Sequence, residues 1–398
     1  MNPLRQRIEE EIRALGPIPF SRYMEICLYD SELGYYSRNA EQFGKAGDFY
    51  TSSDVHAVFG RLLARQFEEM WRALGSPTSI RLIELGPGRG LFAQDVLGWS
   101  EKKFPDFFRA LRYVLVERSK ALRERIAMTL HRYLATGRAV STDTFPTART
   151  GKSTTSVVPK EQQREWALAP EVPTILFANE FFDAMPIDIL STKGSLRIDA
   201  RDGHFIETWA PSSPEELEFI DRYSVHPEPG ERIEVSLAAQ LSMDRIAASI
   251  QGGFIIAIDY GYTREEQLAG RHRGTVKAIR QHSVSVSPYE APGEQDITAD
   301  VNFTALAATA EKHGMHTHKL VTQSQFLMGI GEANQFADAF EECRLPQERA
   351  KVALQLKHLV TPTGIGESFH VLVASKGVKQ ETIESLAGLG FGRRIIAR

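Results

Sequence analysis

Three glycines at alternate positions follow an apolar run that ends with Glu84 and Leu85. The run covers residues 80–85, and Gly86, Gly88 and Gly90 come directly after it. Glycines adopt backbone angles that other residues avoid and have no Cβ, so the backbone there can approach a ligand closely. A strand, a glycine turn and a helix together form a site for nucleotide-like ligands in α/β proteins. The alternative is a glycine-rich turn that binds nothing.

The spacing of these glycines does not fit a dinucleotide site. The dinucleotide fingerprint G-x-G-x-x-G needs a third glycine at position 91, where this chain has Leu91. Glu84 stands two residues before the first glycine, and a carboxylate there can accept hydrogen bonds from an ammonium group. S-adenosylmethionine carries such an ammonium, and NAD does not. The turn, with Pro87 between the first two glycines, therefore favours S-adenosylmethionine over NAD.

A second carboxylate, Glu117, ends the next apolar run, residues 111–117. An acidic residue at this place in an α/β sheet binds the ribose hydroxyls of a nucleotide. We therefore expect Glu117 to hold the cofactor ribose. The alternative is a solvated carboxylate at the end of a strand.

Two carboxylates and an amide follow the apolar run 174–179. They are Asn179, Glu180 and Asp183, and Pro186 ends the segment. Ligands bind at the carboxyl ends of parallel strands, and paired carboxylates suit the fixed donor fork of a guanidinium. We expect Asn179 to contact the cofactor and Glu180 and Asp183 to be catalytic by orienting the acceptor. The alternative is a helix cap, with Asn179 as the N-cap.

Two further segments carry polar groups that fit the same site. Asp48, Thr51 and Ser52 lie in a loop that we expect to cover the cofactor, although such loops also serve only as helix caps. Asp259, Tyr260 and Gly261 end another apolar run, where a plain strand-to-loop turn is an equal alternative.

The histidines at 313, 316 and 318 do not predict a metal site, because no cysteine or acidic residue has a suitable spacing from them. Nucleophile-elbow, P-loop and H-E-x-x-H motifs are absent.

Composition predicts an ordinary globular protein and does not indicate a general nucleic-acid binder, although a local basic groove stays open. The chain has 398 residues, 42% hydrophobic and 25% charged, with a net charge of −4. Cys27 and Cys343 are far apart and predict reduced thiols. The charged N-terminus does not resemble a signal peptide, and no window of 18 apolar residues predicts membrane insertion. We expect a cytoplasmic location.

Strands and helices alternate in the middle of the chain, which predicts an α/β fold with a mostly parallel sheet and an antiparallel edge strand. The expected strands are 80–85, 111–117, 139–142, 174–179, 253–259, 315–322 and 369–374, and the expected helices are 3–14, 20–29, 54–74, 91–103, 119–134, 235–250, 301–313 and parts of 333–360.

The predicted domains follow from this alternation. Residues 1–75 form an N-terminal helical region with the cofactor-covering loop, and 76–184 with 251–376 form a Rossmann-like core. Residues 185–250 form an inserted substrate or lid subdomain with short antiparallel strands and a turn at Asp202-Gly203. Residues 377–398 form a tail, and the polar stretch 147–172 reads as a flexible surface insertion.

Several of these segments together resemble the MidA family of S-adenosylmethionine-dependent methyltransferases, bacterial relatives of a mitochondrial complex I assembly factor. The resemblance runs from about residue 17 to about residue 375. The matching segments are Gly34–Tyr36, Gly47–Asp54, Phe59-Gly60, Glu84–Gly90, Val116-Glu117, Ala178–Pro186, Asp259–Gly261, Gly293–Ala299 and Thr322–Leu327.

The resemblance implies a class I methyltransferase fold with a seven-stranded sheet, an antiparallel edge strand and an inserted α+β subdomain. It implies methylation of a protein arginine, with a respiratory-complex subunit or another arginine-bearing protein as the substrate. This chain differs from the family at the insertion 147–160, at Asp300 and Asn302, and in its tail.

Three other functions remain open from the sequence. They are a non-catalytic cofactor-binding scaffold, a methyltransferase of small molecules or RNA, and an NAD enzyme. The sequence does not identify the methyl acceptor, the number of methyl groups transferred or the oligomeric state.

Overall fold

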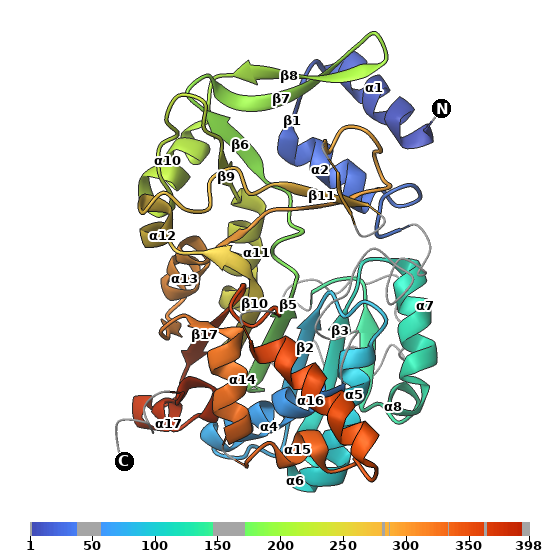
Figure 1. Ribbon diagram of the computed structural model, residues 1–398, viewed down its shortest axis with the longest axis vertical. Coiled ribbons are helices and arrows are strands. Elements are labelled where there is room, and N and C mark those ends of the chain that lie inside the picture. Colours follow the sequence, from blue (N-terminus) through green and yellow to red (C-terminus); the bar gives the residue numbers. More distant parts are fainter. Residues whose placement is uncertain are drawn as a thin grey trace. The chain divides into compact units, whose positions relative to one another are not determined.

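The chain forms two compact units, each assembled from segments that are far apart in the sequence (Figure 1). The computed structural model describes residues 2–37, 57–145, 172–280, 283–285, 287–332, 334–361 and 364–391. The N-terminal unit contains Met1–Phe49, Glu180–Arg245 and Asp259–Lys312. The sheet unit contains Tyr50–Asn179, Ile246–Ile258 and His313–Arg398. The domain bounds expected from the sequence remain a prediction.

The sheet unit is built on a sheet with the strand order β15-β17-β10-β5-β2-β3-β4. Strands β10, β5, β2, β3 and β4 are parallel neighbours, and β15 pairs antiparallel with β17 at one edge. These pairings confirm the predicted parallel sheet with an antiparallel edge strand. The bounds are β2 Ile80–Leu85, β3 Leu111–Val116, β4 Ala139–Thr142, β5 Thr174–Asn179, β10 Gly253–Tyr262, β15 His316–Thr317 and β17 Phe369–Lys376; the short strands β14 Val301–Asn302 and β16 Val321–Thr322 pair with β10 and β17.

Helices connect and flank these strands. Their bounds are α4 Ala57–Ala73, α5 Leu91–Lys103, α6 Pro105–Ala110, α7 Lys120–Thr129, α8 His131–Ala135, α11 Leu237–Ser249, α14 Gln323–Glu332, α15 Ala337–Phe340, α16 Pro346–Val360, α17 Gln380–Glu384 and the 3-10 turn η2 Ala387–Leu389. Helix α4 packs against α5, α14, α15 and α16.

A cluster of buried aromatic rings holds α5 on the sheet. Phe92 of α5 stacks on Phe177 of β5, with ring centroids 4.6 Å apart, and Phe67 of α4 meets both rings edge-on. All three side chains are buried. Because α5 begins directly after the three glycines, this cluster also determines where the glycine turn lies.

The N-terminal unit contains a second, antiparallel sheet in the order β1-β7-β6-β9, with β8 paired to β7. A smaller sheet has the order β12-β11-β13. The bounds are β1 Ile18–Pro19, β6 Asp188–Ser191, β7 Gly194–Arg201, β8 His204–Ala210, β9 Ile233–Val235, β11 Lys277–Arg280, β12 Ser283–Ser285, β13 Asp296–Thr298, α1 Pro3–Leu15, α2 Phe20–Tyr29, α10 Pro214–Tyr223, α12 Arg264–Leu268 and α13 Phe303–Lys312.

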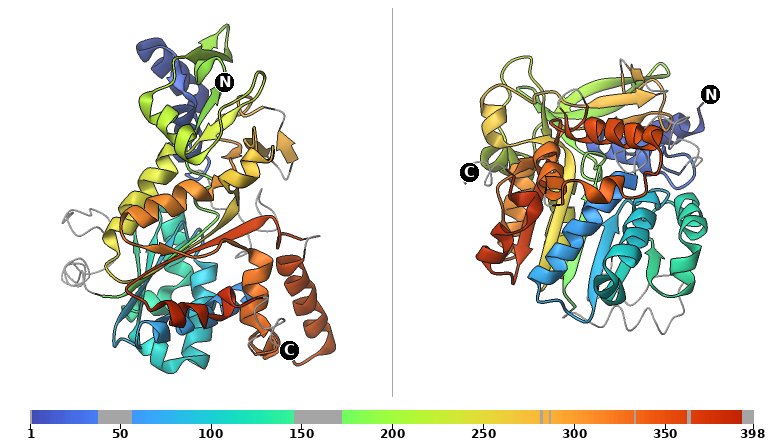
Figure 2. Two further views of the ribbon diagram at one scale, coloured as in Figure 1. Left: turned by 90° about the vertical axis from the view of Figure 1, so that its left-hand side faces the viewer. Right: turned by 60° about the horizontal axis from the view of Figure 1, so that its bottom comes forward.

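Both N-terminal helices pack on this antiparallel sheet rather than on the parallel one. Leu4, Ile8 and Phe20 are buried in one core with Leu196 and Ile198 of β7. Figures 1 and 2 show the blue helices α1 and α2 beside the green strands of this unit. The N-terminal segment therefore builds the same unit as the segment that follows Asn179.

The structure differs from the expected elements at several points. The helix expected over 119–134 is divided into α7 and α8, and Leu130 between them has a non-helical ψ of 17°. Helix α10 lies in a segment where only strands were expected. Ser213 and Glu216 form a capping box at its start, a pattern that is typical of a helix N-terminus. Helix α14 was not expected. In the described part of the chain, no helix is long and apolar enough to cross a membrane.

Candidate functional site

The glycine turn, residues 86–90, has the backbone that its sequence predicts. Gly86, Gly88 and Gly90 have φ values of 62°, 55° and 77°, the left-handed region that favours glycine. The Gly86 N–H donates a 3.0 Å hydrogen bond to the carbonyl oxygen of Val116 on the neighbouring strand. A Cβ built at Gly88 meets no described atom within 4 Å, so the backbone there faces open space. This open cradle fits the close approach of a ligand.

Glu84 is almost fully buried, and its partner is a tyrosine that the sequence did not single out. The Tyr113 hydroxyl donates a 2.8 Å hydrogen bond to Glu84 Oε2. Burial raises the pKa of Glu84 to about 8, and the hydrogen bond from Tyr113 opposes the shift. A cation beside Glu84 would favour its ionised form. The signal for Tyr113 was a polar aromatic residue inside a mostly apolar strand.

Glu117 is tied directly to the glycine turn. Its Oε1 accepts a 2.8 Å hydrogen bond from the Ser119 N–H, and the carboxylate also accepts one from the Gly88 N–H. Burial raises the pKa of Glu117 to about 7, against the lowering effect of these N–H groups. The turn after β2 and the acid after β3 thus form one hydrogen-bonded arrangement. The ribose role of Glu117 remains a prediction.

The segment after Asn179 is a turn, not the start of a helix. Within Glu180–Pro186, here called the Glu180 turn, the described chain has no helix, so the helix-cap alternative is wrong. Glu180 has a φ of 50°, a left-handed conformation that is uncommon outside glycine. Non-glycine residues in this conformation persist where their surroundings over-determine them, often at functional sites.

A buried carboxyl beneath the Glu180 turn holds it in place. Asp259 is fully buried, and its Oδ2 accepts hydrogen bonds from the Phe181 N–H at 3.4 Å and the Phe182 N–H at 3.1 Å. The carboxyl of Asp183, which is 6% exposed, lies close enough to interact with it electrostatically. Burial raises the pKa of both carboxyls above their ordinary values. Asp259 is therefore part of this arrangement and does not merely end a strand.

Tyrosines from the N-terminal helical segment meet the same turn. The Tyr29 hydroxyl donates a 2.9 Å hydrogen bond to the Ala184 carbonyl oxygen, and the Tyr36 hydroxyl donates one of 2.9 Å to Asp296 Oδ1. The charge of Asp183 contributes to the raised pKa of Tyr36, after burial and Asp296. Carboxylates and tyrosines thus gather within the N-terminal unit. Such a set binds cations.

The predicted site residues divide between the two units. Gly88, Glu117 and Asn179 lie in the sheet unit with the other described cofactor candidates, and Glu180 and Asp183 lie in the N-terminal unit. The peptide bond between Asn179 and Glu180 joins them. The predicted covering loop with Asp48, Thr51 and Ser52 lies outside the described residues. Tyr36 and Asp296 stood in matching family segments but received no role from the sequence.

Two other features were tested against the site. His318 Nε2 lies 2.9 Å from Ser375 Oγ, and burial lowers the pKa of His318 to about 4. Among the described residues, no group of three metal-ligating side chains gathers there or elsewhere. The two cysteines, Cys27 and Cys343, are free thiols, one buried and one partly buried.

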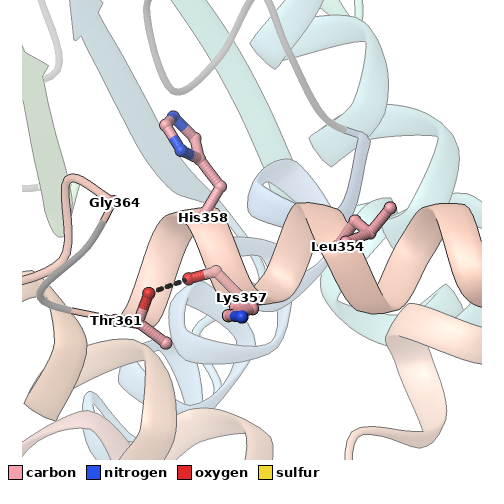
Figure 3. A pocket seen from close by; sticks show the side chains of 5 residues that line it. All are labelled: Leu354, Lys357, His358, Thr361 and Gly364. Atoms are coloured by element: carbon pink, nitrogen blue, oxygen red, sulfur yellow. Dashed lines mark hydrogen bonds between the residues drawn. The ribbon is translucent and has the colours of Figure 1, made fainter.

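A surface hollow beside α16 contains none of the predicted site residues. It is lined by Leu354, Lys357, His358, Thr361 and Gly364 (Figure 3). The Thr361 hydroxyl donates a 2.8 Å hydrogen bond to the Lys357 carbonyl oxygen, an ordinary contact at a helix end. The hollow therefore shares no lining residue with the glycine turn or the Glu180 turn.

Comparison with known families defines the class of this protein. Residues 62–321 match the family described as "Putative S-adenosyl-L-methionine-dependent methyltransferase". The chain belongs to this family of S-adenosylmethionine-dependent methyltransferases, and its cofactor is S-adenosylmethionine. The open cradle at Gly88 and the buried carboxyls of Glu84 and Glu117 fit that cofactor.

Relatives cover nearly the whole chain. It is 30% identical to "Protein arginine methyltransferase NDUFAF7 homolog, mitochondrial" of Drosophila melanogaster, over 98% of this chain and 88% of that protein. It is 27% identical to the Homo sapiens "Protein arginine methyltransferase NDUFAF7, mitochondrial", over 93% of this chain and 82% of that protein.

A crystal structure of a COG1565 superfamily member from Burkholderia thailandensis, bound to S-adenosyl-homocysteine, is similar in fold. Its TM-score is 0.77 at 25% identity, over 97% of this chain and 94% of that chain. These findings confirm the predicted family, fold class and cofactor.

Proposed function

We propose that this enzyme transfers a methyl group from S-adenosylmethionine to an arginine side chain of another protein. The observation that carries the proposal is the set of carboxyls and tyrosines in the N-terminal unit, around Asp183, Asp259 and Tyr36. The names of the Drosophila and human relatives support the same acceptor. A respiratory-complex subunit, which the family resemblance implies, is the first substrate to test.

An arginine acceptor explains why acids are needed at this site. The guanidinium is always charged and presents donors in a rigid, planar fork, which carboxylates match. Glu180 and Asp183 would orient this fork, so that one nitrogen lies in line with the methyl group. The methyl donor supplies an activated methyl on a sulfonium. Because the reacting nitrogen loses a proton, Glu180 would also accept that proton.

The cofactor roles proposed for the sheet unit follow the glycine turn and its neighbours. Gly86, Pro87, Gly88 and Gly90 would cradle the amino-acid end together with Glu84, which would face the ammonium. Glu117 would bind the ribose, and Asn179 would contact the cofactor next to the acceptor. The main tasks of these residues are positioning and alignment.

Transfer of a radiolabelled methyl group tests the proposal directly. Labelled S-adenosylmethionine and the purified protein are added to a lysate from cells that lack it, and labelled protein bands are hydrolysed and analysed for methylated arginine. A matched reaction uses Glu180→Gln, which we expect to abolish transfer while cofactor binding by calorimetry stays nearly intact.

Each result separates one function from another. Methylarginine in a discrete band, lost with Glu180→Gln, supports the proposal and supplies the substrate for mass spectrometry. Label that survives protease but not ribonuclease would move the acceptor to RNA. Cofactor binding without any transfer would favour a scaffold role. If Glu180→Gln weakens cofactor binding as much as transfer, Glu180 belongs to the cofactor site.

A further inference from the structure

The register of two parallel strands places Asp259 beside the Glu180 turn. Asn179, the last residue of β5, pairs with Ile258 of β10. Asp259 and Glu180 are the next residues along the two strands, so they leave the paired region side by side. At this point β10 continues to Tyr262, while β5 ends. The chain after Asn179 therefore turns next to β10, which continues beyond this point, and Asp259 of β10 lies beside the turn.

The turn needs an acceptor at this place. Once β5 ends, the N–H groups of Phe181 and Phe182 have lost a neighbouring strand, and both donate to Asp259 Oδ2. Asp259 is fully buried, so bulk water does not compete with these two N–H groups for its carboxyl. The left-handed φ of Glu180 precedes these two residues directly. This buried side chain thus helps to hold the turn that directly follows Glu180.

The second oxygen of Asp259, Oδ1, is buried and has no hydrogen-bond partner among the described residues. The two hydrogen bonds that the carboxyl accepts therefore both come from the Glu180 turn. Burial and the nearby charges of Asp183 and Glu180 raise the pKa of Asp259 above its ordinary value.

We propose that Asp259 is a positioning residue for methyl transfer, which holds the Glu180 turn through the N–H groups of Phe181 and Phe182. Two kinds of measurement test this inference. The kinetic arm rests on the proposed methyl transfer, whereas the structural arm, amide hydrogen exchange, does not depend on it.

Two substitutions test this role of Asp259. Asp259→Asn removes the charge but keeps an oxygen that can accept from the two N–H groups. Asp259→Leu has a similar volume but neither acceptor nor donor. Glu216→Gln is the matched control, because Glu216 is an equally buried acid of the same unit that caps α10 instead.

The kinetic arm measures kcat, the KM of the acceptor and cofactor affinity. We expect Asp259→Asn to keep kcat within about threefold. We expect Asp259→Leu to lower kcat about 100-fold, the cost of misplacing a reacting group by about 1 Å, with cofactor affinity nearly unchanged. Glu216→Gln leaves kcat as in the wild type. Equal losses in the Asn and Leu variants, or full activity of Asp259→Leu, would overturn the positioning role.

The structural arm needs no acceptor and no activity. Amide hydrogen exchange at Phe181 and Phe182 is measured in the wild type and both variants. We expect protection in the wild type and in Asp259→Asn, and its loss in Asp259→Leu while the β2 and β5 amides stay protected. Unprotected amides in the wild type would overturn the inference. Protected amides in an enzyme that methylates no arginine would instead contradict the proposed function.

Discussion

The Tyr113 hydroxyl and the Glu84 carboxyl form a 2.8 Å hydrogen bond between neighbouring strands, next to the glycine turn. Tyr113 is fully buried and Glu84 is 5% exposed, so little water competes for this contact. Burial keeps the proton on Glu84 up to about pH 8 in the ligand-free protein. A bound ammonium would remove that proton. Protein stability is therefore linked to pH through this residue, and the proposed contact with the ammonium would link cofactor affinity to pH as well.

Replacing Glu84 changes how stability depends on pH. The folded-state pKa, about 8, lies above the value of an unfolded chain, so the folded protein keeps a proton that the unfolded chain loses. The free energy of unfolding therefore falls as pH rises from about 5 to about 8. We expect Glu84→Gln to remove about 2 kcal/mol of this decline between pH 6 and pH 8.

Urea denaturation of the ligand-free protein at several pH values measures this effect. Tyr113→Phe is the companion variant, because it deletes the hydrogen bond that lowers the pKa of folded Glu84 and so extends the decline to higher pH, while the start of the decline stays unchanged. Parallel pH curves for the wild type and Glu84→Gln would show that Glu84 is ionised in the folded protein.

Gly88→Asp tests the cradle for the cofactor. The position has a left-handed φ and open space, and aspartate tolerates that conformation better than most residues. The fold should persist while a carboxylate enters the cradle. We expect calorimetry to show cofactor binding at least about 100-fold weaker, or about 3 kcal/mol. Gly75→Asp is the matched control, since Gly75 has a φ of 84° and equally open space; equal loss in both variants would assign the effect to strain.

Tyr36→Phe tests the acceptor side. The substitution deletes the hydroxyl that donates to Asp296 and leaves the ring in place. We expect the KM of the acceptor to rise about three- to tenfold, with cofactor affinity unchanged, because only one hydrogen bond to a charged group is lost. Steady-state kinetics at saturating cofactor measures it. Tyr29→Phe, which loses a bond to a backbone carbonyl, provides the comparison; a weaker cofactor affinity in Tyr36→Phe alone would place Tyr36 in the cofactor site.

Phe92→Ala tests the aromatic support of the glycine turn. Phe92 is 2% exposed and stacks on Phe177, so its removal leaves a cavity under the start of α5. We expect a loss of about 3–5 kcal/mol in the free energy of unfolding and weaker cofactor binding. Phe107→Ala, in a buried position on α6, serves as the control for stability alone. Unchanged cofactor affinity in Phe92→Ala at a temperature where it is folded would show that the turn does not depend on this stacking.

Local patterns in the sequence were enough for the elements of the parallel sheet. The apolar run 80–85 and the helix 91–103 have the predicted bounds, because a buried strand, a glycine turn and an amphipathic helix are each coded within a few residues. The same holds for the left-handed glycines at 86, 88 and 90. Helix α10 was not predicted, although the capping box of Ser213 and Glu216 is visible in the sequence. The reason is that the surrounding segment was interpreted as short antiparallel strands.

By itself the sequence determined the fold class, the cofactor turn and the family, since these depend on short-range spacing and on motifs. Only the tertiary structure decided the partners of the buried acids: Tyr113 for Glu84, the Gly88 N–H for Glu117, and the Phe181 and Phe182 N–H groups for Asp259. It also decided that the N-terminal helices pack in one unit with the chain after Asn179. These partners come from different strands or loops. The spacing of residues along the sequence therefore does not determine which buried donor binds which carboxyl in the folded protein.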